Sequence, residues 1–164
     1  MRDVLRRLSL RAFAPALLGL MPGLAAAESV TSTLSVSAVV EPTCSVALNP
    51  VAFGSIDPAT GAKANGNLTV TCTPGTGWSA SADGGSGGTA GARRMTSGAG
   101  TLDYALYTSA DRSQAWGDGS GATGLFTGTG TGAPQPFPIH GEIPASQAAA
   151  AGNYSDVIAV TVTY

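Results

Sequence analysis

Two cysteines, Cys44 and Cys72, are the residues of this chain best suited to covalent chemistry. In an oxidising compartment such a pair forms a disulfide by default, which would stabilise a small domain by roughly 3 to 4 kcal/mol. A metal or redox site is the alternative use of the same thiols. The chain has no Cys-x-x-Cys pair, and its single histidine, His140, cannot complete a zinc set by itself. These residue types therefore favour a structural bridge.

The other polar residues do not form a catalytic motif. The sequence has no Gly-x-Ser-x-Gly elbow, no second histidine and no pair of carboxylates suited to acid–base catalysis. Asp103, Asp111 and Asp118 lack the spacing of a calcium loop. We expect a structural role for His140, no metal or other cofactor, and no enzymatic activity.

Two tryptophans are further candidates for binding, and an arginine pair is a candidate for proteolytic cleavage. Trp78 and Trp116 could stack on sugars, but a small β-domain needs large aromatic side chains for its core, so we expect both in the core. Arg93 and Arg94 lie in a Gly-rich stretch, where we expect a solvated loop.

The first 27 residues predict an export signal. Four arginines precede an apolar run over residues 12–24, and three alanines follow at the cleavage position. The mature chain would begin at Glu28. Export to an oxidising compartment supports the disulfide between the two cysteines.

The mature chain is acidic. Four of the eight basic residues and one of the ten acidic residues lie in the signal, which leaves four basic residues against nine carboxylates. Nucleic acids and anionic membranes are bound by clustered Lys and Arg, so this balance argues against both as partners.

Apolar and polar residues alternate at both ends of the mature chain. In residues 29–40 one face of a predicted strand carries Val30, Leu34, Val36, Ala38 and Val40, with Ser32 as its polar member. In residues 156–164 one face carries Ile158, Val160, Val162 and Tyr164. The ends could pair with each other within one subunit, or the first could complete the fold of another subunit, and periodicity cannot decide between these interpretations.

Short strands separated by turns predict an all-β Greek-key sandwich over residues 42–164. Further strands are expected at residues 44–48, 51–56, 67–73, 78–82, 102–107, 125–129 and 134–143. Prolines should keep the strand at 134–143 bent or at a sheet edge. Residues 83–100 should form a long loop or a loose hairpin, and residues 147–151 a helical turn at most.

Several short motifs together resemble one known family. They are Cys44, Phe53-Gly54, Cys72-Thr73-Pro74-Gly75, Arg94-Met95, Leu102-Asp103-Tyr104-Ala105-Leu106-Tyr107, Trp116-Gly117-Asp118-Gly119, Gly141-Glu142-Ile143-Pro144, Ala151-Gly152-Asn153-Tyr154-Ser155-Asp156 and Val160-Thr161-Val162-Thr163-Tyr164. In this order they resemble the spore coat protein U domain, the pilin-like family of archaic chaperone–usher pili. Glu142 stands where many relatives carry a basic residue, and the run Ala148–Ala151 is expanded.

The resemblance implies an incomplete immunoglobulin-like sandwich that is completed by donor-strand exchange. Residues 28–41 would be the donor strand, and the alternating residues of the C-terminal strand would line the acceptor groove. The implied partners are identical or related pilin subunits, a periplasmic chaperone and an outer-membrane usher, and the implied location is a surface pilus. Two alternatives are a spore or cell coat protein without an usher-built fibre, and a tip adhesin that binds a glycan through Trp116, Tyr107 or the Gly-rich loops.

Overall fold

A computed structural model describes residues 27–164. The predicted signal at residues 1–27 therefore lies outside the described residues, except for Ala27. Among the described residues no helix is long and apolar enough to cross a membrane. The chain divides into two units, residues 1–38 and residues 39–164, which we describe separately.

The described part of the first unit, residues 27–38, holds most of the segment in which we predicted an N-terminal strand. These residues adopt no regular secondary structure. The apolar residues of its alternating face are exposed, with 95% of Val30 and 89% of Leu34 accessible. The prediction of a strand is thus not met within one chain, because none of the described strand pairs involves residues 27–42. Among the described residues, the C-terminal strand, β10 (Val160–Thr163), pairs only with β3 (Gly77–Ala82).

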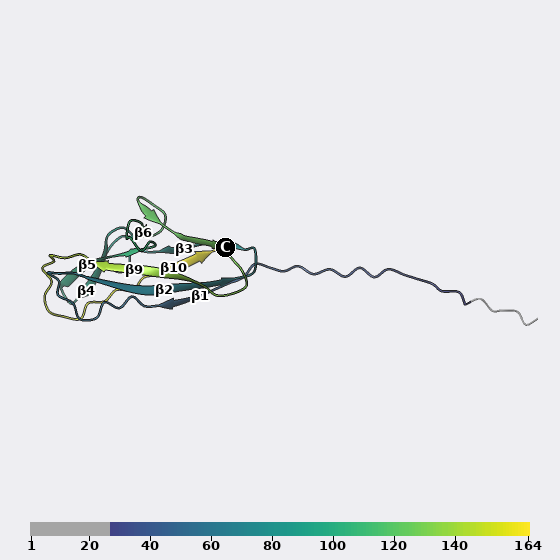
Figure 1. Cartoon of the computed structure of the whole chain (residues 1–164), viewed down its shortest axis with the longest axis horizontal. Helices are drawn as coiled ribbons and strands as arrows, with labels where there is room; N and C mark the ends of the chain where they lie inside the picture. The colour runs from purple at the N-terminus through teal and green to yellow at the C-terminus, as the bar shows by residue number, and fades with distance from the viewer. Residues whose placement is uncertain (1–26) are drawn as a thin grey trace, which may run out of the picture. The chain divides into compact units, whose positions relative to one another are not determined.

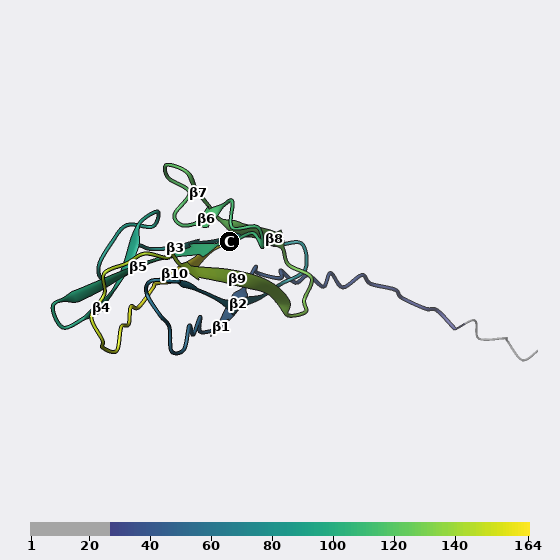
Figure 2. The ribbon, with the colours of Figure 1, turned by 60° about the vertical axis from the view of Figure 1, so that its left-hand side comes forward.

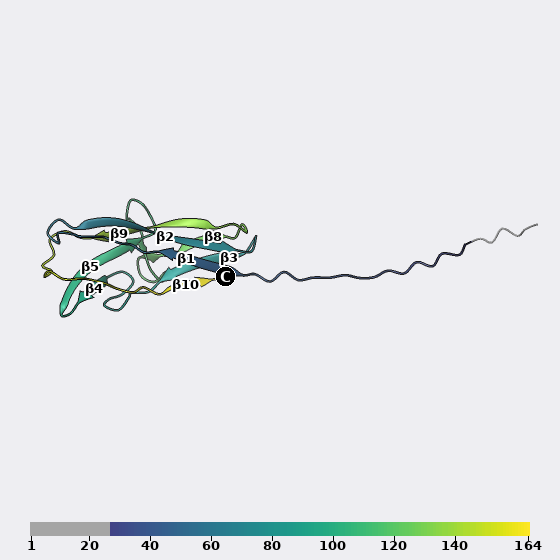
Figure 3. The same cartoon turned by 90° about the horizontal axis from the view of Figure 1, so that it is seen from below.

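The second unit consists of two β-sheets (Figures 1 and 2). The large sheet has the order β1 (Cys44–Asn49), β2 (Ala62–Cys72), β9 (Gln135–Ile143), β5 (Gly100–Tyr107), β6 (Ala115–Trp116) and β7 (Thr123–Gly124). In addition, β4 (Arg93–Ser97) pairs with β5 in a hairpin at one end of the domain (Figure 3). The small sheet has the order β10 (Val160–Thr163), β3 (Gly77–Ala82) and β8 (Phe126–Thr129). The predicted all-β class is confirmed.

Alternation along the strands builds the core between the sheets. Leu68, Val70 and Cys72 on β2 are buried together, as predicted. Both tryptophans are also buried, and 1% of Trp116 is accessible. The Trp116 indole N–H donates to the carbonyl of Ala80 at 3.0 Å, so the one polar atom of this core side chain is satisfied. The prediction that both tryptophans belong to the core is confirmed.

The disulfide between Cys44 and Cys72 is present. The two residues are directly opposite each other in the antiparallel pair of β1 and β2. The bridge therefore joins the first residue of β1 to the last residue of β2.

Two local predictions are corrected by the structure. The expected strand at residues 51–56 has no regular secondary structure, because no described strand supplies hydrogen-bond partners to it. The C-terminal strand begins at Val160, not at residue 156, because pairing with β3 starts there. Residues 147–151, where a helical turn was the most that we expected, form none. The strand predicted at residues 134–143 is β9, which lies between β2 and β5.

The prolines of β9 lie where the strand has one neighbour. Pairing with β5 covers residues 140–142, whereas pairing with β2 covers residues 135–143. Pro136 and Pro138 are therefore on a stretch that is an edge on the β5 side, where a missing N–H leaves no partner unsatisfied.

Arg93 is a further correction. It is 2% exposed, not solvated, and it opens β4. Its guanidinium donates to the carbonyls of Ala82, Asp83, Ala90 and Trp116 at 2.6 to 3.2 Å. Burial lowers the pKa of Arg93, and nearby Tyr104 and acidic side chains oppose that effect. The guanidinium thus holds several loops together. A hydrophobic side chain at this position would leave their buried carbonyl groups without hydrogen-bond donors.

Candidate assembly groove

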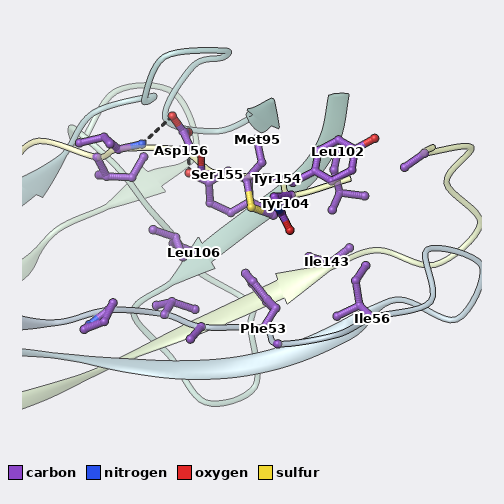
Figure 4. A pocket seen from close by; sticks show the side chains of 18 of the residues that line it. Phe53, Ile56, Met95, Leu102, Tyr104, Leu106, Ile143, Tyr154, Ser155 and Asp156 are labelled. Carbon is purple, nitrogen blue, oxygen red and sulfur yellow. Dashed lines mark hydrogen bonds between the residues drawn. The ribbon is translucent and has the colours of Figure 1, made fainter. Parts of the chain in front are cut away.

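A large apolar cavity of about 1090 Å³ lies between the chain that follows β1 and the chain that precedes β10. Figure 4 shows Phe53 and Ile56 on one side of the cavity, Tyr154, Ser155 and Asp156 on the other, and Leu106 between them. We call this cavity the groove. Its two walls come from parts of the sequence that are about 100 residues apart, as the positions of Phe53 and Tyr154 indicate.

The floor of the groove is the hydrophobic core itself. Leu102, Tyr104 and Leu106 alternate along β5, are buried, and line the cavity together with Ile143 of β9. Core side chains at the bottom of an open cavity are unusual, because packed interiors leave few voids larger than a water molecule. The cavity therefore reaches the hydrophobic core between the two walls.

The first wall starts at β1. Val46 and Leu48 are directly opposite Val70 and Leu68, which are fully buried, so all four side chains share the core face of the sheet. Nevertheless, 44% of Val46 and 47% of Leu48 are accessible. Among the described strands β1 pairs only with β2, so no described strand pairs with its other edge.

The first wall continues through residues 50–56, which lie close to the sheet because two glycines make room for them. A Cβ placed on Gly66 would lie 2.7 Å from Val51 Cγ2, and a Cβ on Gly141 would lie 2.6 Å from Val51 Cγ1. The Gly141 position would also meet Phe53 Cζ at 2.9 Å. Any larger residue at these positions would displace the wall.

The second wall consists of residues 153–160. The backbones of Ser155 and Thr96 exchange two hydrogen bonds of 3.1 and 3.2 Å. The carbonyl of Ala159 accepts from the N–H of Asp83 at 3.0 Å, and its N–H donates to Asp83 Oδ1 at 3.0 Å. This wall is therefore fixed along one edge, by β4 and by the loop after β3, while β10 has no neighbour besides β3.

Asp156 fixes the second wall to the floor. Its Oδ2 accepts from the Tyr104 hydroxyl at 2.7 Å, and its Oδ1 accepts from the N–H groups of Ser86 and Val157 at 2.8 Å each. Partial burial raises the pKa of Asp156, but the hydrogen bonds from Ser86, Tyr104 and Val157 outweigh it and hold the pKa below its usual value. Burial, and then the bond to Asp156, raise the pKa of Tyr104. At neutral pH the pair is thus a carboxylate and a neutral phenol.

The structure places the predicted groove residues as follows. Ile158 and Val160 line the cavity. Val162 is half-buried and packs against the core, whereas 57% of Tyr164 is accessible. That these residues accept a strand stays a prediction.

Sequence reasoning missed most of the groove. The floor residues were recognisable only as one face of an alternating strand, and Phe53 only as an aromatic beside a bend. His140 takes no part: its Nδ1 lies 3.0 Å from Asn65 Oδ1, on a cross-strand pair of β2 and β9. Trp116 is too deeply buried to stack on a sugar, which removes one residue from the adhesin interpretation.

Comparison with known proteins decides the family. The family model of the Spore Coat Protein U domain matches residues 30–161. This chain belongs to that family. The resemblance seen in the short motifs is therefore confirmed over nearly the whole mature chain.

Two known proteins resemble this chain, one in sequence and one in fold. Protein U of Myxococcus xanthus is 41% identical over 75 residues, which are 44% of this chain and 40% of the relative. A chain of the CsuC–CsuE chaperone–tip adhesion subunit pre-assembly complex, from the archaic chaperone–usher Csu pili of Acinetobacter baumannii, superimposes with a TM-score of 0.59 at 20% identity. That match covers 76% of this chain and 40% of the other. This chain thus spans about 40% of the length of each relative.

Proposed function

We propose that this protein is a structural subunit of a chaperone–usher fibre, which polymerises when residues 28–41 of one subunit fill the groove of the next. The groove is the observation that carries the proposal. Its floor is hydrophobic core at the bottom of an open cavity, and its two walls end in strand edges that no other described strand pairs with. A strand inserted there would hydrogen-bond along its length and bury alternate side chains, which is β-strand addition.

The N-terminal segment has the length and pattern of such a strand. The row from Val30 to Val40 covers eleven residues, or roughly 36 Å of extended chain. On the side of the first wall, the residues that line the cavity run from Leu48 to Ile56, a stretch of nine residues. Burial of the row would contribute a gross hydrophobic free energy on the order of 5 to 10 kcal/mol, before ordering costs. The contact is heterologous, since each subunit donates at one end and accepts at its groove, and contacts of this kind can build open fibres.

The proposed partners follow from the same open groove. A subunit with an open apolar groove would need a periplasmic chaperone to cover it before assembly, and an usher at the outer membrane to exchange that chaperone for the next donor. Family membership and the fold shared with a chain of a chaperone–subunit complex support this route. The proposal places the mature protein in a surface fibre, with a structural and not an enzymatic role.

Leu34→Asp tests the proposal, and Ser35→Asp is its matched control. Both variants add one carboxylate to the same exposed segment, but Leu34 belongs to the apolar row and Ser35 to the polar face. With the candidate chaperone and usher, we expect Leu34→Asp to abolish fibres seen by electron microscopy and Ser35→Asp to retain them. Recovery of the chaperone complex should be equal for both, because the groove itself is unchanged. Normal fibre yield from Leu34→Asp would refute the donor role.

A second candidate function is a coat protein that assembles without an usher. The match to Protein U and the name of the family favour it. The two candidates differ in their requirement for the usher. Surface assemblies that persist after deletion of the neighbouring usher gene would favour the coat protein.

A further inference from the structure

We propose that the junction of residues 41–43 prevents the N-terminal segment from filling the groove of its own subunit, and so reserves it for a second copy. This inference rests on the proposed function and concerns the occupant of the same groove. The question arises because the segment leads directly into β1, whose free edge belongs to the groove wall. A hairpin at the junction would lay residues 29–40 along that edge, and the subunit would complete itself.

The register of that hairpin decides which face of the segment enters the groove. Cys44, Val46 and Leu48, all even-numbered, face the core. Directly opposite residues of an antiparallel pair share a face, so an even-numbered donor row must lie opposite even-numbered residues of β1. The apolar row of the segment is even-numbered throughout, from Val30 to Val40.

A two-residue hairpin gives the wrong face. With residues 41 and 42 in the loop, Val40 lies opposite Thr43 and Val39 opposite Cys44. Ser37 and Ser35 would then follow on the core side, and the apolar row would face solvent. This slip of one residue exposes every side chain that the groove should bury.

Three-residue hairpins give the right face, but each loop that could form at this junction is disfavoured. Such a loop is a type I turn followed by a residue in the left-handed conformation. With residues 39–41 in the loop, Glu41 would have to be left-handed and Val40 would leave the buried row. With residues 40–42 in the loop, Pro42 would have to be left-handed, which its ring forbids. With residues 41–43 in the loop, Pro42 would occupy the second turn position, where proline is disfavoured, and the β-branched Thr43 would be left-handed.

Thr43 is in addition held in an extended pairing with Thr73. Its N–H donates to Thr73 Oγ1 at 3.1 Å, and its carbonyl accepts from the Thr73 N–H at 3.0 Å. A turn at Thr43 would break these bonds beside the disulfide. A five-residue loop over residues 39–43 also restores the right face, but it loses the same bonds and removes Val40 from the buried row.

Pro42→Gly tests this inference, and Pro42→Ala is the matched control. Glycine adopts the left-handed conformation at little cost, so residues 40–42 can form the loop while Thr43 keeps its bonds to Thr73. Alanine also lacks the proline ring, but the left-handed conformation remains costly for it. This cost lowers the population of that conformation about tenfold relative to glycine. The oxidised exported chain is refolded without chaperone, and monomer is separated from polymer by size-exclusion chromatography. Amide exchange of residues 29–38 reports insertion.

We expect Pro42→Gly to give at least about tenfold more monomer with protected amides in residues 29–38 than Pro42→Ala does. Adding Leu34→Asp to Pro42→Gly should abolish that monomer, because the gain depends on the inserted row. Equal polymer yield from Pro42→Gly and the unmodified chain, with unprotected amides in the monomer, would overturn the inference and leave the proposed function intact. A wild-type monomer whose residues 29–38 are already protected would overturn both.

Discussion

The hydroxyl of Tyr104 and the carboxylate of Asp156 are 2.7 Å apart, and their hydrogen bond joins the floor of the groove to its second wall. Tyr104 lies on β5 inside the sandwich, whereas Asp156 precedes β10 at the open edge. This side-chain contact thus ties together two segments 52 residues apart on either side of the groove.

Removal of that hydrogen bond should make the second wall more mobile, while the packing of the groove floor is kept. In Tyr104→Phe the ring remains but the hydroxyl is lost, and we expect a fall of about 1 to 3 kcal/mol in the free energy of unfolding, since the acceptor is charged. Urea denaturation of the chaperone-free oxidised chain measures this change. Amide exchange should increase at residues 157–159, and equal exchange in the variant and the parent would contradict the role assigned to this bond.

Acid should weaken the same wall. Because the folded-state pKa of Asp156 lies below its usual value of 3.8, its contribution to stability is complete above that value and is lost as the pH falls through the folded pKa. We therefore expect Asp156→Asn to lower stability at pH 7, and its difference from the parent to shrink at pH values below 3.8. Unfolding curves recorded across this range measure the difference, and a gap that stays constant with pH would contradict the assignment.

The two neighbouring arginines should differ sharply in their effect on stability. Arg93→Met would leave several buried carbonyls without a donor, and we expect a loss of about 3 to 5 kcal/mol or failure to fold. Arg94→Met removes only an exposed ion pair with Asp103, of 2.7 Å, and should cost less than about 1 kcal/mol. Thermal unfolding of both variants checks the comparison, which equal losses would contradict.

Gly141→Ala should damage the first wall of the groove. The added Cβ would meet Val51 and Phe53 at less than 3 Å, so these side chains must move. We expect a destabilisation of about 1 to 3 kcal/mol and weaker chaperone binding. Gly77→Ala is the control, because no heavy atom lies within 4 Å of a Cβ at that position. Parental chaperone affinity in Gly141→Ala would show that the wall does not depend on this close packing.

The disulfide between Cys44 and Cys72 should add to the free energy of unfolding of the domain. The bridged residues are 28 positions apart, so replacing both with alanine should cost about 3 to 4 kcal/mol by the loop-entropy model. Thermal unfolding of the double variant, compared with the oxidised parent, measures this loss. An unchanged midpoint would mean that the bridge adds no stability.

The sequence alone determined those features that depend on residue type and local period. Alternation located most of the strands, including the buried row of β2, and the two cysteines left one possible bridge. The ordered motifs indicated the family. These features are recoverable because a strand with one buried face must repeat every two residues, wherever its partners lie.

The tertiary structure decided which edges have partners and which side chains meet. Local pattern predicted a strand at residues 51–56, and the Gly-rich surroundings placed Arg93 in solvent. Both outcomes depended on neighbours distant in the sequence. The groove exists for the same reason: Phe53, Tyr104 and Tyr154 come together only after β1, β5 and the chain before β10 have been arranged. Local pattern specifies a face for each strand, but only non-local pairing determines whether anything covers that face.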